Sequence, residues 1–565
     1  MTDPDALLDA LDPQQRAAAE ALVGPVAILA GAGTGKTRTI THRIAYGIAT
    51  GRYSGPRTMA LTFTRRAGEE LRGRLRQLGA GDVQARTFHA AALAQLSHFW
   101  PQVVGGTMPR IVEAKGALIA DAARAEQLPT DAGSVRDLAA EIEWRKVNDL
   151  TIDEWAASGR RVGGMPVDRV AAVQRAYEEL KDERQQMDLE DVLLATAGML
   201  AAEPGVARAV REQYRTFVVD EYQDVSPIQH RLLRLWLGDR TDLCVVGDAN
   251  QTIYTFAGAS PRHLLGFGAE FPGAQLHRLE RSHRSAQPIL DAANRLMRGR
   301  PGALELTAVA PATAPRAAAS TVAPAVRTHA TDADERAALV QAIRADLADG
   351  IPAHRIAVLV RLNAQAPELD AALRGAGFAV TLRGDARFFA QPHVREAIVH
   401  LIVARRAAPT EVPAAATVRG VLSGLGWSPE APADEATAAA RERWHALDAL
   451  HRMALDAGEL DYRAFIDELL ERQAANDDPV AGSVAIATMH SAKGLEWDSV
   501  HVIGLAEGLL PISYATDEAG IDEERRLLYV AITRARTRLR LSWAVRQHAR
   551  ASERAPSRFL AELGL

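Results

Sequence analysis

Cysteine is nearly absent from the chain, which has 565 residues and a single thiol, that of Cys244. One thiol cannot form an intramolecular disulfide, and it cannot supply the four cysteines of a structural zinc site. Such scarcity suits a reducing compartment, so we expect a cytoplasmic protein. The first eleven residues carry three aspartates and no basic residue, which argues against a secretory signal.

Long apolar runs are missing as well. No stretch approaches the roughly 18 consecutive apolar residues of a membrane-spanning helix, so we expect no contact with a membrane. Hydrophobic residues make up 47% of the chain, a share typical of a globular protein. At roughly 100–200 residues per domain, the length predicts about three to five structural units.

An excess of basic charge is also lacking, since the formal net charge is −5. A protein whose main task is to coat nucleic acid is usually basic, and this balance therefore argues against a passive coat. It does not exclude a narrow basic groove, because only the field of the groove acts on the phosphates.

Lysine is scarce among the basic residues. The chain has 61 arginines and five lysines, at positions 36, 115, 146, 181 and 493. A GC-rich coding bias accounts for the excess of arginine, yet it makes each remaining lysine informative. A compact ammonium fits inside a phosphate-wrapping loop where a planar guanidinium would not.

Short apolar runs that stop at turns predict buried parallel strands. These runs are residues 26–30, 58–63, 216–220, 243–247, 355–360, 484–488 and 499–504. Helical stretches lie between several of them, which indicates parallel α/β sheets. The strands form two groups, before and after about residue 283, and this grouping predicts two such domains.

Two long stretches, residues 91–184 and 391–483, have the pattern of helices rather than strands. We interpret each as a mainly helical insertion in one α/β domain. The first domain is then predicted to comprise residues 1–90 and 185–282. The second is predicted to comprise residues 283–390 and 484–565.

A glycine-rich turn, Ala-Gly-Ala-Gly-Thr-Gly-Lys-Thr at residues 30–37, follows the first strand and opens a helix. Small residues let backbone N–H groups surround phosphate oxygens, and the helix N-terminus adds partial positive charge. Lys36 would reach the β- and γ-phosphates, and the Thr37 hydroxyl would hold Mg²⁺. Alanine is tolerable at the first position if Ala30 keeps a negative φ. The alternative is an ordinary glycine-rich turn between a strand and a helix.

A second predicted strand ends in two carboxylates, Asp220 and Glu221. In P-loop enzymes a strand-end aspartate helps to hold Mg²⁺, and a second group positions the attacking water. We assign the first role to Asp220 and the second, as the base, to Glu221. The alternative is a solvated strand end.

Further motifs follow in an order typical of one family. They are residues 11–16, 62–67, 87–89, 220–224, 246–254, 279–285, 488–496 and 524–535. With the phosphate-binding turn, they make the chain resemble superfamily 1 helicases of the UvrD/Rep/PcrA type over nearly its whole length. The resemblance implies two RecA-like P-loop motor domains, with ATP and Mg²⁺ as cofactors. The implied partners are single-stranded DNA and single-strand/duplex junctions.

For ATP, the resemblance implies that Gln15 reads the adenine edge and that Gln251 senses the γ-phosphate. Arg284 and Arg534 would reach that phosphate from the second domain, where guanidinium groups stabilise charge on the transferred phosphoryl oxygens. The complete predicted nucleotide-contacting set is Gln15, Arg16, Ala30, Gly31, Ala32, Gly33, Thr34, Gly35, Lys36, Thr37, Arg38, His283 and Glu496.

For DNA, the resemblance implies contacts from both domains. The predicted set is Thr62, Phe63, Arg65, Thr87, Phe88, His89, Tyr254, Phe256, Arg361, Asn363 and His490. Bases can stack on aromatic rings, and we predict that Tyr254 and Phe256 form a stacking platform linked to ATP through Gln251. Core packing is the alternative, above all for Phe88.

Three residues depart from the family pattern: Phe256 stands in place of Trp, Ala257 in place of Arg, and His283 in place of the common Tyr. The second insertion is also shorter than the family's accessory subdomain. We therefore keep two interpretations. The first is a 3′–5′ DNA helicase of repair or replication, with the polarity implied by the resemblance alone. The second is a translocase that strips bound proteins from single strands and unwinds poorly alone.

A nucleotide-gated DNA-binding scaffold is a third hypothesis, and it would need a broken hydrolysis site. The predicted hydrolysis residues are nevertheless all present: Lys36, Asp220, Glu221, Gln251, Arg284 and Arg534. We expect an enzyme that is a monomer in isolation and that has a repair protein as partner.

Overall fold

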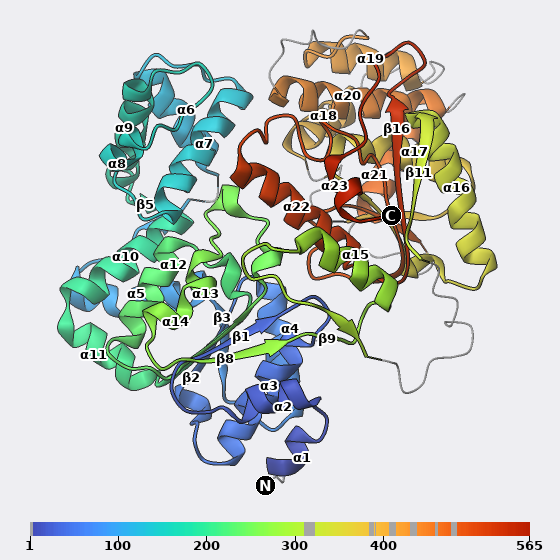
Figure 1. Cartoon of the computed structure of the whole chain (residues 1–565). Coiled ribbons are helices and arrows are strands. Elements are labelled where there is room, and N and C mark those ends of the chain that lie inside the picture. The colour runs from blue at the N-terminus through green and yellow to red at the C-terminus, as the bar shows by residue number, and fades with distance from the viewer. Residues whose placement is uncertain are drawn as a thin grey trace. The chain divides into compact units, whose positions relative to one another are not determined.

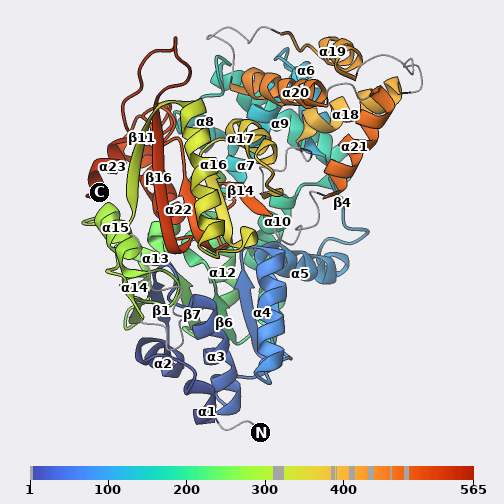
Figure 2. The same ribbon diagram turned by 90° about the vertical axis from the view of Figure 1, so that its right-hand side faces the viewer.

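A computed structural model describes residues 4–112, 114–309, 323–383, 389, 391–405, 414–429, 438–457, 461–475 and 483–565. The chain forms two compact units, one of Met1–His283 with Gly299–Val309 and one of Arg284–Arg298 with Ala310–Leu565. Figures 1 and 2 show the elements of each unit. No helix of the described residues is both long enough and apolar enough to cross a bilayer.

The first unit is built on a sheet of six parallel strands in the order β3-β2-β6-β7-β1-β8. Their bounds are β1 Val26–Ala30, β2 Thr58–Thr62, β3 Gln84–Thr87, β6 Thr216–Val219, β7 Leu243–Gly247 and β8 Gln275–Leu279. Because every strand points the same way, the residues that follow β1, β6 and β7 meet at one edge. The phosphate-binding turn and the acidic pair both lie at this edge.

Successive side chains of these strands point to opposite faces of the sheet and pack into two separate cores. Leu61 and Val219 face one core, while Ala60 and Val218 face the other. The helices over the first core are α5 Phe88–Val103, α10 Leu189–Ala202, α11 Pro204–Gln213 and α12 Pro227–Leu237. Those over the second are α3 Lys36–Ala49 and α4 Arg65–Gln77 (Figure 1).

Shorter elements complete this part of the first unit. They are α1 Pro4–Leu8, α2 Pro13–Glu20, β4 Arg110–Ile111, β5 Gln186–Met187, α13 Arg262–Leu265, α14 Phe267–Glu270, β9 Arg281–Ser282 and β10 Thr307–Ala308. The predicted boundary at residue 283 needs one correction, because Gly299–Val309 belongs to the first unit and not to the second. β10 pairs with β9, and Leu306 is fully buried against the phosphate-binding turn.

The helical insertion has its own apolar core. Its helices are α6 Lys115–Ala125, α7 Ala132–Val147, α8 Ile152–Ala157 and α9 Val167–Glu183. Trp155 and Tyr177 are almost fully buried among them. Buried aromatic rings of this size supply much of the apolar area that a small bundle can bury.

A buried ion-pair network joins this insertion to α10. Lys146 of α7 is 1% exposed and lies 2.7 Å from Asp188 and 2.6 Å from Asp191. Lys181 of α9 pairs with the same two aspartates, and the hydroxyl of Tyr177 donates to Asp188 at 3.0 Å. Burial alone would raise the pKa of Asp188, but Lys146 and Lys181 outweigh it and hold that pKa well below its usual range.

The second unit repeats the architecture with a parallel sheet in the order β11-β16-β15-β12-β14-β13. Its strands are β11 Ala325–Thr331, β12 Ile356–Val360, β13 Val380–Arg383, β14 Val484–Thr488, β15 Trp497–Val502 and β16 Ala535–Arg546. Its helices are α15 Gln287–Met297, α16 Asp332–Ala348, α17 Ala366–Gly375, α22 Glu518–Ile532 and α23 Arg558–Glu562. Figure 2 shows α16 along β11 and β16.

Four helices make up the described part of the second insertion. They are α18 Pro392–Ala404, α19 Ala414–Gly424, α20 Ala438–Asp456 and α21 Tyr462–Ala475. Their apolar residues, such as Leu450 and Ile466, belong to the same core as Val358 and Ile486 of the sheet. This insertion therefore shares the core of its motor unit, whereas the first insertion has a core of its own.

We expect the Lys146→Met substitution to lower the free energy of unfolding by about 3–5 kcal/mol, because it leaves buried carboxylates without their cation. Urea unfolding followed by circular dichroism measures this. Arg169→Met, which removes the more exposed ion pair with Glu126, is the control and should cost under about 1 kcal/mol. Equal midpoints for the two variants would contradict the assignment.

The same network sets the response to acid. A carboxylate with a lowered folded pKa stabilises the protein above its unfolded pKa of about 3.9, and this stability is lost as the pH falls toward the folded value. In Lys146→Met the folded pKa of Asp188 should rise, so the acid-induced loss of stability should be smaller and should end at a higher pH than in the unmodified chain.

Candidate nucleotide and DNA site

The phosphate-binding turn joins the end of β1 to the start of α3. Gly33 and Gly35 adopt the left-handed conformation with φ of 75° and 79°, which favours glycine. The described non-glycine residues with positive φ do not include Ala30, so alanine is accommodated there as predicted. The ammonium of Lys36 donates to the carbonyl of Ala30 at 3.2 Å, which folds its side chain back over the turn.

Residues that follow β8 hold this turn in place. The backbone N–H of Gly31 donates to Leu279, and that of His283 donates to Gly33 at 2.9 Å. The Ser282 hydroxyl donates to the carbonyl of Ala32 at 3.0 Å. A Cβ on Gly31 would lie 2.3 Å from the side chain of Leu306, so glycine is required there by packing.

Further predicted nucleotide contacts lie on residues beside the turn. Asp12 caps α2 by accepting from the backbone of Gln15, and the Gln15 amide donates to the Thr34 carbonyl at 2.9 Å. The imidazole of His283 lies 2.8 Å from the carboxylate of Asp12. Arg38 donates to the Ala10 carbonyl, and Arg16 pairs with Glu20 on the surface.

The two strand-end carboxylates lie against the turn. The Thr37 hydroxyl is 3.4 Å from a carboxylate oxygen of Asp220, which is nearly buried. Burial, and then the charge of Glu221, raise the pKa of Asp220 to about 7. A hydroxyl and a buried carboxylate are oxygen donors that suit Mg²⁺, and a cation there would relieve the repulsion. The donor set therefore fits the predicted metal.

Glu221 adopts φ of 50° and ψ of 46°, which is left-handed and strained for a residue with a side chain. Its carboxylate accepts from the Gln223 amide at 2.6 Å. The carbonyl oxygen of the same amide accepts from the backbone N–H of Asp248 at 3.0 Å. The carboxylate of Asp248 in turn accepts from Gln251 at 2.8 Å.

This hydrogen-bonded series links the end of β6 to the end of β7 and continues into the aromatic segment. Gln223 and Asp248 lie within the sequence motifs at residues 220–224 and 246–254, from which no role was predicted for either residue. Spacing gave one signal, because both follow strand ends that a parallel sheet brings to one edge. A Cβ on Gly247 would lie 2.4 Å from the Gln223 oxygen, so the glycine makes room for the amide.

The second unit brings together the three residues predicted to contact nucleotide from that side. Arg284 donates to Glu496 at 2.6 Å and to the carbonyl of Thr533 at 3.3 Å. Arg534 is nearly buried and donates to the Thr533 hydroxyl at 3.2 Å. Burial opposes ionisation of Glu496, but Arg284 and Arg536 outweigh it and lower its pKa. Glu496 therefore holds Arg284 beside Arg534 within this unit.

Three aromatic rings of the first unit form a cluster at its surface. Phe63 and Tyr254 stack with ring centroids 5.8 Å apart, and Phe256 meets Tyr254 edge-on at 6.1 Å. Phe63 is 42% exposed and Phe256 is 65% exposed. Exposed rings after β2 and β7 offer faces on which bases can stack, which fits the predicted platform.

Phe88 differs from these three. Its ring is 4% exposed and stacks on Trp236 inside the core, so the core-packing alternative describes this residue. Of the other predicted contacts in the first unit, the hydroxyl of Thr87 caps α5. The hydroxyl of Thr62 donates to the carbonyl of Thr64, and Arg65 begins α4. Burial and the charge of Lys115 lower the pKa of His89.

The predicted contacts of the second unit lie at the ends of β12 and β14. The guanidinium of Arg361 forms three hydrogen bonds with Glu524, at 2.8–3.1 Å, and is therefore neutralised within the unit. The side-chain oxygen of Asn363 is buried and has no hydrogen-bond partner among the described residues. Burial, and then the charges of Arg361 and Lys493, lower the pKa of His490 to about 4, so its ring is neutral at pH 7.

Fold and site together define a P-loop nucleoside triphosphatase with two parallel-sheet units. Two family models match nearly the whole chain: the UvrD/REP helicase N-terminal domain over residues 11–272, and the UvrD-like helicase C-terminal domain over residues 277–410 and 430–546. The chain therefore belongs to the UvrD/REP family of superfamily 1 DNA helicases.

Several curated relatives are similar over most of their length. The ATP-dependent DNA helicase UvrD2 of Mycobacterium tuberculosis is 43% identical, over 98% of this chain and 82% of the relative. The same species' ATP-dependent DNA helicase UvrD1 is 30% identical over 96% and 83%. DNA helicase II of Escherichia coli is 28% identical over 99% and 88%.

The Gln223→Ala substitution should lower kcat for ATP hydrolysis about 10- to 100-fold, because hydrogen bonds to charged groups contribute about 1.5–3 kcal/mol. KM for ATP should stay within about twofold, since Gln223 makes no hydrogen bond to the phosphate-binding turn. Steady-state kinetics with saturating single-stranded DNA separates the two constants.

Gln213→Ala, which removes an exposed amide of α11, is the matched control and should leave both constants unchanged. Gln223→Glu should be at least as impaired as the alanine variant, because a carboxylate cannot donate to Glu221 and repels it. An unchanged kcat in Gln223→Ala would overturn the positioning role.

Proposed function

We propose that this chain is an ATP-dependent DNA helicase that translocates 3′–5′ on single-stranded DNA and unwinds duplex in repair or replication, acting in the cytoplasm. The observation that carries the proposal is the hydrogen-bonded series from Glu221 through Gln223 and Asp248 to Gln251. It connects the predicted hydrolysis site to the segment that bears Tyr254 and Phe256. The names of the relatives support the activity, and the family resemblance is the ground for the polarity.

In this mechanism Thr37 and Asp220 would hold Mg²⁺, which would neutralise charge on the phosphates. Glu221 accepts the proton of the attacking water, and Lys36 leaves the Ala30 carbonyl to contact the triphosphate. Gln251 reports the state of the γ-phosphate to the aromatic segment. Arg284 and Arg534 are assigned to the same triphosphate, so that binding and hydrolysis of ATP would alternately draw the two units together and release them.

A translocase that strips proteins from single strands and unwinds poorly alone is the second candidate. Phe256 is exposed and Ala257 follows it, where the family usually has Trp and Arg. A smaller ring and a lost charge both weaken contacts with DNA. This candidate predicts the same ATPase with little strand separation.

The test compares duplexes that carry a 3′ or a 5′ single-stranded tail. We expect DNA-stimulated hydrolysis, with strand separation on the 3′-tailed substrate only. Glu221→Gln should lower hydrolysis at least about 100-fold, the typical contribution of a general base, while it retains ATP binding. Hydrolysis with no unwinding of either substrate would favour the stripping translocase, and separation of the 5′-tailed duplex would refute the polarity.

Phe256→Ala should weaken binding of a single-stranded oligonucleotide about 5- to 150-fold, since one base–aromatic stack contributes roughly 1–3 kcal/mol. Fluorescence anisotropy at fixed salt measures the affinity. Leu276→Ala removes a comparably exposed apolar side chain from β8 and should bind DNA as the unmodified chain does. If the two variants bind equally well, Phe256 is not part of the platform.

A further inference from the structure

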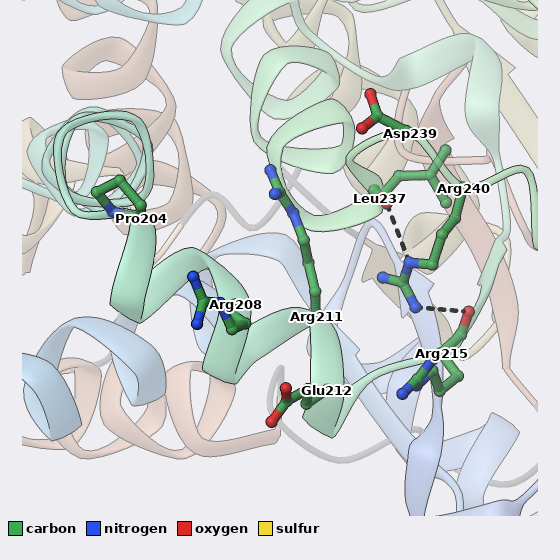
Figure 3. A pocket seen from close by; sticks show the side chains of 8 residues that line it. All are labelled: Pro204, Arg208, Arg211, Glu212, Arg215, Leu237, Asp239 and Arg240. Carbon is green, nitrogen blue, oxygen red and sulfur yellow. Dashed lines mark hydrogen bonds between the residues drawn. The ribbon is translucent and has the colours of Figure 1, made fainter.

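A hollow of about 400 Å³ lies between α11 and the turn that follows α12 (Figure 3). Its lining residues are Pro204, Arg208, Arg211, Glu212, Arg215, Leu237, Asp239 and Arg240. Arg215 immediately precedes β6, and Arg240 stands three residues before β7. The hollow therefore lies at the amino edge of the first sheet, opposite the edge that carries the phosphate-binding turn.

Four arginines meet two carboxylates in this hollow, and the opposite charges are not paired. None of the four guanidinium groups forms an ion pair with a carboxylate of the described residues, and neither lining acid forms one either. Arginine abounds in this chain, but most of its half-buried arginines bond to acids, as Arg336 and Arg540 do. The lack of an ion pair distinguishes the half-buried Arg211 and Arg240 from most other half-buried arginines of the described residues.

Backbone carbonyls, and not acids, hold two of the four side chains. Arg211 donates through Nε to the carbonyl of Leu235 at 3.0 Å. Arg240 donates to the carbonyls of Trp236, Leu237 and Tyr214 at 2.9–3.1 Å. Burial, with the nearby charges of Arg215 and Arg211, lowers the pKa of Arg240, and the opposing charge of Asp242 does not offset them.

The backbone is shaped to allow this arrangement. Gly238 ends α12 with φ of 62°, and a Cβ there would lie 2.8 Å from Nε of Arg211. Any other residue would be strained and would displace the guanidinium from the carbonyl that fixes it. The terminal nitrogens of Arg211, and every guanidinium nitrogen of Arg208 and Arg215, make no hydrogen bond among the described residues.

We propose that this arginine hollow binds phosphate groups at the edge of the sheet opposite the ATP site. A tetrahedral phosphate accepts hydrogen bonds from several guanidinium groups at once. A planar carboxylate is suited to the two parallel hydrogen bonds of a single guanidinium group. Four guanidinium groups against two carboxylates leave a net charge of about +2, which suits one or two phosphates. The phosphate comes either from a nucleic-acid backbone outside the motor track or from a free phosphorylated ligand.

The test uses the double variant Arg208→Ala/Arg215→Ala in the full chain, because neither side chain makes a hydrogen bond within the part of the chain that the structure describes. Arg52→Ala/Arg278→Ala removes the same charge from exposed positions elsewhere on this unit and is the control. In the DNA arm, affinity for single-stranded and duplex oligonucleotides is measured at increasing salt. Loss of one or two phosphate contacts should lower the slope of log K against log salt by roughly 1–2.

The second arm titrates inorganic pyrophosphate by calorimetry in a Lys36→Ala background, which weakens binding at the ATP site. A site present in that background and lost when Arg208 and Arg215 are also replaced would identify a free phosphorylated ligand. Either a reduced salt slope or a lost pyrophosphate site supports the proposal. If both measurements match the control variant, the proposal is wrong.

Folding is checked in parallel by thermal unfolding of both double variants. Should the alanine variant unfold early, Arg208→Lys/Arg215→Lys keeps the charge but removes the planar forks. A specific phosphate site predicts at least about a threefold loss of pyrophosphate or DNA affinity in this lysine variant. Unchanged affinity in the lysine variant would mean that the hollow contributes diffuse charge only, which also overturns the proposal.

Discussion

The amide of Gln223 is the contact on which the nucleotide edge of the first unit depends. The amide donates through its nitrogen to the carboxylate of Glu221 and accepts through its oxygen from the backbone N–H of Asp248. These two hydrogen bonds join the end of β6 to the end of β7. The absence of a side chain at Gly247 leaves room for the Gln223 amide. Glu221 can then keep its strained backbone, because its surroundings fix both the main chain and the side chain. The aromatic segment after β7 is attached to the same point.

Lysine and arginine occupy different kinds of position in this chain. Lys36 and Lys493 stand in sequence motifs, and Lys115, Lys146 and Lys181 all take part in the ion pairs where the helical insertion meets α10. A small ammonium can lie between two or three buried carboxylates, whereas a guanidinium needs more room and a planar approach. Arginine takes the remaining positions, which include those that bind backbone carbonyls. Lys146 and Lys181 thus mark buried places where the charge must be compact.

The sequence predicted the two parallel sheets well, because strands such as 26–30 and 484–488 are buried on both faces and read as continuous apolar runs. The phosphate-binding turn and the acidic pair followed from local spacing. The sequence did not predict that Gly299–Val309 belongs to the first unit, because this depends on the packing of Leu306 against Gly31, which lies 275 residues earlier in the chain. The burial of Phe88 and the pairing of Arg361 with Glu524 were equally hidden, because a motif names a side chain but not its partner. The role of Gln223 could not be predicted from the sequence, because it depends on the register in which β6 and β7 pair.

The chain passes between its two units three times, after His283, after Arg298 and after Val309. Helix α15, which lies between the first two crossings, buries Ile289, Leu290 and Leu296 in the second unit and contacts α22 and β16. A protease cut beyond Val309 would leave α15 on the amino-terminal fragment and its packing partners on the other fragment. The two fragments would then remain bound, because the apolar face of α15 on the amino-terminal fragment packs against the carboxy-terminal fragment. Nicked protein would migrate as one species until denatured, and separately expressed halves would each lack a piece of the second core.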